Sequence, residues 1–138
     1  MHSNKLDQAR RSVHHIHELI HSIFTSPTEQ ASAAITALMP VFADTFTMVS
    51  TAGAVLSRKQ IEQMFKRVQG TRPGLEIILS DIEPLQQEGD RVVLRYKEVH
   101  RLLGVETARL SVVLLEVMTA GARWHYLQET AVSQDLAQ

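Results

Sequence analysis

Four long strand-like segments joined by short turns fill the second half of the chain, and they constrain the fold more than any other feature. Their apolar residues either alternate with polar ones or run on over several positions, which is typical of strands. Short connections that contain glycine favour antiparallel neighbours. We therefore expect an antiparallel meander whose strands cover Leu75–Leu85, Arg91–Leu103, Val105–Met118 and Arg123–Val132.

The first half of the chain carries helical patterns. Apolar residues at three- and four-residue spacing predict a first helix over residues 6–24. Ser26, Pro27 and Glu29 match a capping box, which predicts a second helix that ends near Pro40. The remaining predicted elements are a turn through Phe42, a small hairpin over residues 46–56, and a helix that Ser57 caps and Gly70 ends.

Length and charge narrow the class of protein. A chain of 138 residues leaves room for one domain, spanning residues 1–138. Fourteen basic against fifteen acidic residues give no positive footprint for nucleic acid. No apolar run approaches the roughly 20 residues of a membrane-spanning helix, and residues 1–11 lack the apolar stretch of a secretory signal. We expect a cytoplasmic protein that binds neither nucleic acid nor membrane.

The order of these elements resembles the SnoaL-like members of the nuclear transport factor 2-like (NTF2-like) superfamily. The resemblance implies an α+β fold, in which a curved, mainly antiparallel sheet forms a cone-shaped barrel around about three N-terminal helices. It also implies a pocket between sheet and helices, and subunits that often pair through their sheets. The segments that carry the resemblance are Phe46-Thr47-Met48-Val49-Ser50, Gly53, Val55-Leu56, Gly89-Asp90, Val92-Val93, and Gly121 with Trp124.

One face of the strand predicted over residues 91–103 combines apolar and polar side chains. Strand side chains alternate, so Tyr96, Glu98 and His100 share a face with Val92 and Leu94. Polar groups on an otherwise buried face indicate the wall of a pocket. Glu98 is a candidate general base whose pKa apolar surroundings would raise, with His100 as the other catalytic candidate and Tyr96 orienting the ligand.

Two neighbouring strands supply further candidates for ligand binding. Arg109 is available to neutralise Glu98, which would lower the pKa of the carboxyl and weaken it as a base. Alternation along the last strand puts aromatic and amide side chains on a single face. The ligand-binding candidates are therefore Tyr96, Arg109, Ser111, Trp124, Tyr126 and Gln128.

Histidines on one side of the first helix raise the question of a metal. His14, His17 and His21 lie close together on a helical wheel, and His17-Glu18-Leu19-Ile20-His21 matches the short zinc-protease pattern. No convincing third ligand follows downstream, and such short patterns arise by chance. We therefore expect no metal, and we interpret the histidines as a polar helix edge with His17 near the pocket mouth.

Three functions remain open at this point. The first is a pocket protein that binds a small, partly apolar molecule. The second is an acid-base isomerase, cyclase or dehydratase that needs no cofactor, and the third is a dimerisation or assembly module. A Glu98 held by Arg109 would favour binding, whereas a Glu98 without an arginine partner would favour the enzyme. Because both faces of the strand over residues 105–118 look buried, we also expect a homodimer that pairs through the sheet.

Overall fold

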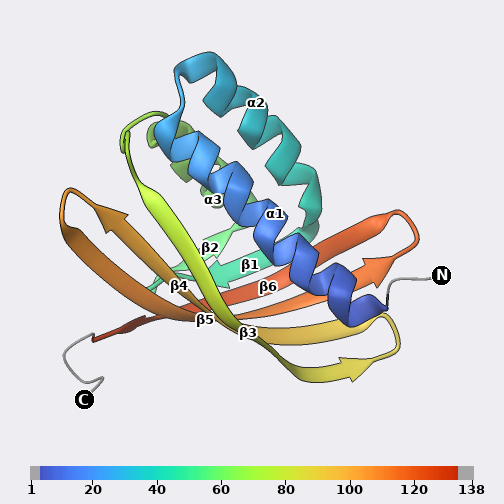
Figure 1. Ribbon diagram of the computed structural model, residues 1–138. Helices are drawn as coiled ribbons and strands as arrows, with labels where there is room; N and C mark the ends of the chain where they lie inside the picture. The colour runs from blue at the N-terminus through green and yellow to red at the C-terminus, as the bar shows by residue number, and fades with distance from the viewer. Residues whose placement is uncertain (1–3, 134–138) are drawn as a thin grey trace.

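The computed structural model describes residues 4–133 and shows helices followed by a sheet (Figure 1). Residues 1–3 and 134–138, which the predicted domain includes, lie outside the described residues. None of the helices in the described part is long and apolar enough to cross a membrane. The elements are α1 (Lys5–Thr25), α2 (Thr28–Leu38), a 3-10 turn (Met39–Val41), β1 (Phe42–Val49), β2 (Val55–Ser57), α3 (Arg58–Arg67), β3 (Glu76–Glu88), β4 (Arg91–Leu102), β5 (Val105–Met118) and β6 (Gly121–Val132).

The six strands form one curved sheet in the order β2-β1-β6-β5-β4-β3. Strands β3 to β6 pair antiparallel in sequence order, which confirms the predicted meander and the α+β class. The pairing of β1 with β6 is parallel and was not predicted. Local patterns carry no information about such a contact, because the whole meander separates the two strands in the sequence.

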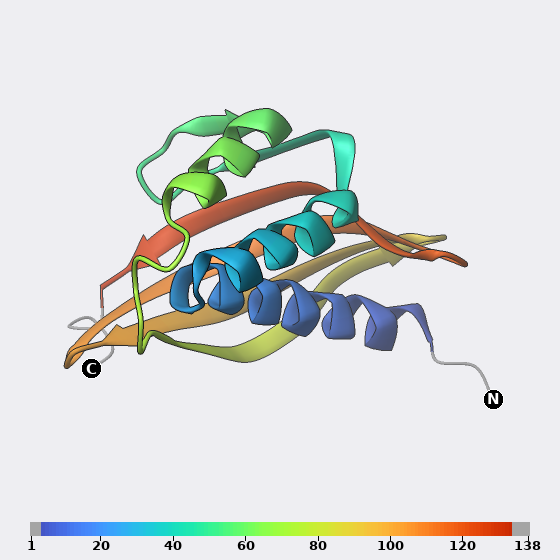
Figure 2. The same ribbon diagram turned by 90° about the horizontal axis from the view of Figure 1, so that it is seen from above.

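Helices α1 and α2 lie side by side across the concave face of the sheet, and α3 covers the part of it near β1 and β2 (Figures 1 and 2). The α1 residues Val13, Ile16 and Ile23 face the sheet because their spacing of three and seven keeps them on one side of the helix. They meet the buried side chains of Leu94 and Trp124, and this layer between helices and sheet is the hydrophobic core.

The two predicted capping boxes have different outcomes. At α3 the box is confirmed, since Ser57 Oγ accepts from Gln60 N at 3.2 Å and Gln60 Oε1 accepts from Ser57 N at 2.8 Å. At α2 the prediction is wrong, because the N-cap residue is Pro27 and has no side-chain hydrogen bond. Ser26 instead ends α1, donating its backbone N–H to Ser22 O at 3.0 Å.

Gly70 connects the end of α3 to the end of α1. Its φ of 66° lies in the left-handed region, and its N–H donates to Ile23 O at 2.8 Å. A Cβ at this position would lie 2.8 Å from Ser26 O, which no side chain could tolerate without a shift of the backbone. The glycine therefore lets the loop after α3 approach the end of α1 closely.

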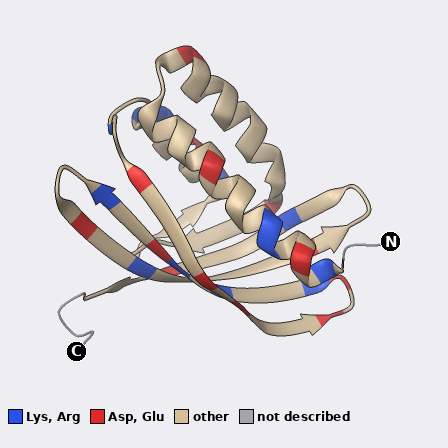
Figure 3. Cartoon of the chain, viewed as in Figure 1, with Lys and Arg blue, Asp and Glu red and all other residues tan. Residues whose placement is uncertain are grey.

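Lys, Arg, Asp and Glu are interspersed over helices and strands (Figure 3). On β4 the charged residues Arg91, Arg95 and Arg101 are exposed, whereas Val92 and Leu94 are buried. Strand alternation thus separates an outer, charged side of β4 from the inner side that faces the helices.

Candidate functional site

A cavity of about 260 Å³ lies between the concave face of the sheet and the helices α1 and α3. Most of its wall is aromatic or aliphatic, and its polar groups come from α1, β4, β5, β6 and the loops that follow β1 and α3. A larger groove of about 530 Å³ runs between α1 and β3, but exposed residues such as His14, Glu18 and Glu76 form its walls. The cavity is lined by Ile16, His17, Ile20, Phe24, Phe42, Phe46, Met48, Ser50, Thr51, Leu56, Ile61, Met64, Phe65, Arg72, Glu98, His100, Arg109, Trp124, Leu127 and Glu129.

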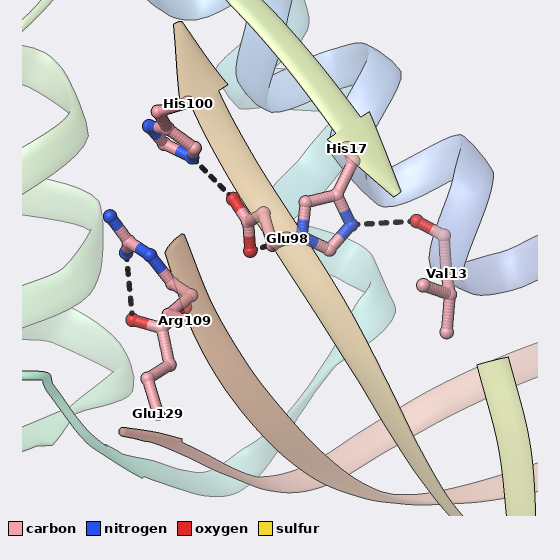
Figure 4. Close-up of polar contacts among 6 residues, drawn as sticks. All are labelled: Val13, His17, Glu98, His100, Arg109 and Glu129. Carbon is pink, nitrogen blue, oxygen red and sulfur yellow. Dashed lines mark hydrogen bonds and ion pairs between the residues drawn. The ribbon is translucent and has the colours of Figure 1, made fainter. Parts of the chain in front are cut away.

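Three buried polar side chains, His17, Glu98 and His100, form a hydrogen-bonded network at the cavity wall (Figure 4). His100 Nε2–H donates to Glu98 Oε2 at 2.5 Å, and His17 Nε2 lies 3.1 Å from Glu98 Oε1. The alternation of β4 puts Glu98 and His100 on the inner face, while α1 brings in His17 from 81 positions earlier in the chain.

The second nitrogen of His17 determines the protonation state of this network. His17 Nδ1 lies 2.8 Å from Val13 O, and a carbonyl only accepts, so this nitrogen carries a hydrogen. If Nε2 is also to donate to the Glu98 carboxylate, the ring must be an imidazolium. Burial lowers the pKa of His17, but the hydrogen bond and negative charge of Glu98 outweigh that effect and raise it overall. The pair is therefore an imidazolium and a carboxylate.

The pKa of Glu98 moves in the direction opposite to that expected for a general base. Burial raises the pKa of this carboxyl, but the hydrogen bonds from His100 and His17 and the positive charge of the His17 ring hold it well below its usual range. Glu98 is thus ionised at neutral pH and a poor proton acceptor. The prediction of a raised pKa is wrong, because Glu98 accepts a hydrogen bond from His17, which the sequence did not place beside it, as well as one from His100.

Arg109 lies opposite Glu98 on β5 but forms its ion pair with another residue. The two Cα atoms are register partners, yet Arg109 Nη1 donates to Glu129 Oε1 at 3.3 Å (Figure 4). The two histidines, and not Arg109 as predicted, therefore neutralise Glu98. Burial raises the pKa of Glu129, and the charge of Glu98 adds to this effect, while Arg109 opposes it.

The face predicted for the last strand is wrong beyond Trp124. The register of β6 against β5 shifts after Trp124, because Trp124 pairs with Leu115 while Tyr126 pairs with Leu114. The extra residue reverses the alternation, as a β-bulge does. Tyr126 and Gln128 consequently lie on the outer face and line no part of the cavity; there Tyr126 donates its hydroxyl hydrogen to Gln128 Oε1 at 2.7 Å.

Leu127 and Glu129 take the inner positions that were assigned to Tyr126 and Gln128. Sequence reasoning missed Glu129 as a site residue and placed His17 only near the pocket mouth. The sequence of the last strand did contain one sign of this bulge. Trp124 and Leu127 are both large and apolar but three positions apart, and a regular strand cannot point both toward one core.

Tyr96 and Ser111 face inward as expected but lie under the network rather than on the cavity wall. They are register partners on β4 and β5, and both are fully buried. The Tyr96 ring makes an edge contact with the His17 ring at a centroid distance of 5.4 Å. Burial raises the pKa of the Tyr96 hydroxyl well above its usual value, with the charge of Glu98 adding to the effect. Tyr96 is therefore a neutral packing partner of His17.

The histidines of α1 point to different partners. His17 belongs to the buried network, His21 Nε2–H donates to Leu75 O at 2.8 Å, and His14 is exposed. Among residues 4–133 no group of three or more His, Cys, Asp or Glu side chains is placed to hold a metal ion. The match to the zinc-protease pattern therefore does not correspond to an assembled set of ligands in this part of the chain.

Comparison with solved structures identifies relatives of this fold. An NTF2-like protein of unknown function from Pseudomonas aeruginosa is 33% identical, with a TM-score of 0.84 over 91% of this chain and 99% of that chain. An NTF2-like protein from Cytophaga hutchinsonii is 12% identical, with a TM-score of 0.66 over 89% and 98% of the two chains. No protein-family model and no curated protein sequence matches.

The extent of the first match defines the class, since it is above 30% identity and spans nearly the whole of the relative. The chain belongs to the NTF2-like superfamily. A structure from Novosphingobium aromaticivorans, described as NTF2-like with a cystatin-like fold, shares the architecture at 16% identity and a TM-score of 0.59, over 77% and 74% of the two chains. Fold alone does not fix the activity, so the function is argued from the cavity.

Proposed function

We propose that the protein binds a small, partly apolar molecule in the cavity between the sheet and the helices α1 and α3. The observation that carries this proposal is the make-up of the cavity wall, in which Phe46, Phe65 and Trp124 share a space with the polar groups of Glu98, His100 and Arg109. Ligand sites commonly combine a mainly apolar wall with a few fixed polar groups. A volume of about 260 Å³ suits a ligand of one or two rings.

The state of Glu98 supports binding over the enzymatic alternative that uses Glu98 as base. Glu98 has no arginine partner, which taken alone would favour an enzyme. The two histidines, however, do what an arginine was expected to do, because they stabilise the carboxylate and lower its pKa. A base of low pKa removes protons poorly at neutral pH. Orientation of a bound molecule is therefore the better supported role for the network.

A large side chain that fills the cavity should weaken ligand binding. We expect 2-methoxynaphthalene to bind the full-length protein, and a Leu56→Trp substitution to weaken its binding by at least about 10-fold, because the indole would occupy the space of the ligand. Leu56 lines the cavity, whereas its neighbour Val55 is 70% exposed and does not. Val55→Trp is thus the matched control, and isothermal titration calorimetry measures both. Equal affinities for the two variants, or no binding of either 2-methoxynaphthalene or 2-naphthol to the unaltered protein, would contradict the proposal.

We also propose that two subunits pair through the outer face of the sheet. The helices cover only the concave face of the sheet (Figures 1 and 2). By strand alternation, the outer face of β4 and β5 carries Val93, Val112 and Leu114, all half-buried, and Leu110, which is 41% exposed. The apolar patch that these four side chains form on the outer face suits an interface. Light scattering should give twice the mass of one chain, and Leu110→Glu should give a single chain. Val55→Glu at the far edge of the sheet should leave the dimer intact, and a monomeric unaltered protein would refute this pairing.

A further inference from the structure

His100 presents an unsatisfied buried nitrogen beside the cavity. Among residues 4–133, three buried side-chain atoms have no hydrogen-bond partner: Tyr96 Oη, Ser111 Oγ and His100 Nδ1. Tyr96 and Ser111 do not line the cavity, whereas His100 does. Buried polar atoms in proteins are nearly always paired, so a buried unpaired nitrogen in a cavity-lining residue indicates a partner that enters from the cavity.

The network makes this nitrogen an acceptor when the His100 ring is neutral. Glu98 is ionised and accepts hydrogen bonds at both oxygens, from His17 and from His100. His100 therefore carries its hydrogen on Nε2, and in the neutral ring Nδ1 keeps a lone pair. Donation to a carboxylate also polarises the imidazole and strengthens that lone pair as an acceptor. A ligand group that can only accept would leave the nitrogen unpaired.

We infer that the ligand carries an acidic hydroxyl group, of the phenol or enol kind, which donates its hydrogen to His100 Nδ1. This inference rests on the proposed function and adds the chemical class of the molecule that is bound. Glu98 is then a positioning residue that sets the tautomer of His100. His17 and its bond to Val13 O hold Glu98 in the charged form that this arrangement requires.

Arg109 favours an acidic hydroxyl over an ordinary alcohol. Its guanidinium lies on the same side of the sheet as the His100 ring (Figure 4) and is bound to Glu129 through Nη1. The other N–H groups of the guanidinium are donors for the oxygen of a hydroxyl that has given its hydrogen to His100. A phenol or enol oxygen gathers more negative charge in such a bond than an alkyl alcohol does, so a nearby cation stabilises it more.

A pair of probes that differ in one methyl group tests the inference. We expect 2-naphthol to bind the full-length protein about 10-fold or more tightly than 2-methoxynaphthalene, which cannot donate and leaves Nδ1 unpaired. Calorimetry at pH 7 measures both affinities. His100→Asn places an amide near the position of Nδ1, so the preference should persist above about five-fold, whereas His100→Gln reaches toward the Nε2 position and should reduce it below about two-fold.

The outcomes separate this inference from the proposed function. If both probes bind with equal affinity, the cavity is a binding site but the hydroxyl inference is overturned. If neither binds, the proposed function itself fails. Loss of the preference in both variants would overturn the role of Nδ1. Should a variant misfold, nitrogen NMR of the unaltered protein decides. 2-Naphthol must then shift the His100 Nδ1 resonance while the ring hydrogen stays on Nε2, and an unchanged Nδ1 resonance would overturn the inference.

Discussion

A Glu98→Gln substitution is expected to lower the free energy of unfolding by about 4 kcal/mol at pH 5.5, because removing one partner of a buried ion pair leaves the other charge uncompensated. Glutamine keeps the size of the side chain but not the charge. The side chains of Glu98 and His17 are 4% and 6% exposed, so water cannot replace the lost partner of the imidazolium. Urea unfolding of both proteins gives the difference.

The pH dependence of that difference identifies the His17 charge as its cause. The pKa of His17 is raised from 6.5 by folding, so its contribution to stability is fully present below pH 6.5 and is lost as the pH rises through the folded value. The pKa of Glu98 is lowered from 4.5, so its contribution is present above pH 4.5 and is lost only in strong acid. The effect of Glu98→Gln should thus be largest between pH 4.5 and 6.5 and should shrink at pH 9.

Glu83→Gln is the matched control for Glu98→Gln. Glu83 also forms an ion pair, with Arg95 at 3.1 Å, but its side chain is 58% exposed. Exposed pairs contribute little, so this change should cost no more than about 0.5 kcal/mol at either pH. If Glu98→Gln lowered the free energy of unfolding by the same amount at pH 5.5 and pH 9, the loss would not come from a buried His17 imidazolium.

Trp124→Ala is expected to cost about 4 kcal/mol of unfolding free energy, the range seen when large buried aromatic residues are removed. Trp124 is fully buried, packs edge-on against Phe42 at a centroid distance of 6.2 Å, and donates its Nε1 hydrogen to Ser12 Oγ at 2.9 Å. It therefore joins β6 to β1 and α1 at the wall of the cavity. Thermal or urea unfolding measures the loss.

Two smaller changes at the same place separate packing from hydrogen bonding. Trp124→Phe keeps most of the aromatic contact and should cost less than half as much as Trp124→Ala, while Ser12→Ala removes only the hydrogen-bond acceptor and should cost about 1 kcal/mol. If Trp124→Ala lowered the free energy of unfolding by less than about 1.5 kcal/mol, the residues around Trp124 would have to repack easily into the space it leaves. That result would contradict a cavity whose wall is already formed in the protein without ligand.

Strand alternation carried most of the correct sequence-based expectations. It placed Tyr96 and Glu98 on the buried face of β4, opposite the exposed Arg95, because a strand with one face in the core must alternate regularly. The same rule put Arg109 and Ser111 on the inner face of β5. These positions depend only on local geometry, which the sequence encodes directly.

The contact between Glu98 and His17 was not predictable in the same way. His17 lies 81 positions away on a helix, and only the packing of α1 across the sheet brings its ring to the carboxylate. The bulge in β6 had a similar effect, since one extra residue moved Gln128 outward and Glu129 inward. A long-range contact and a break in register are both properties of the assembled sheet, so neither follows from the alternation of one strand.

A crystal structure of the protein grown with 2-naphthol would show directly whether the cavity between the sheet and the helices binds the ligand. We expect a naphthalene ring among Phe46, Phe65 and Trp124, with its oxygen within hydrogen-bonding distance of the His100 ring and near Arg109. Naphthol bound in the groove between α1 and β3, or on the outer face of the sheet with the cavity left closed, would contradict the claim that this cavity is the binding site.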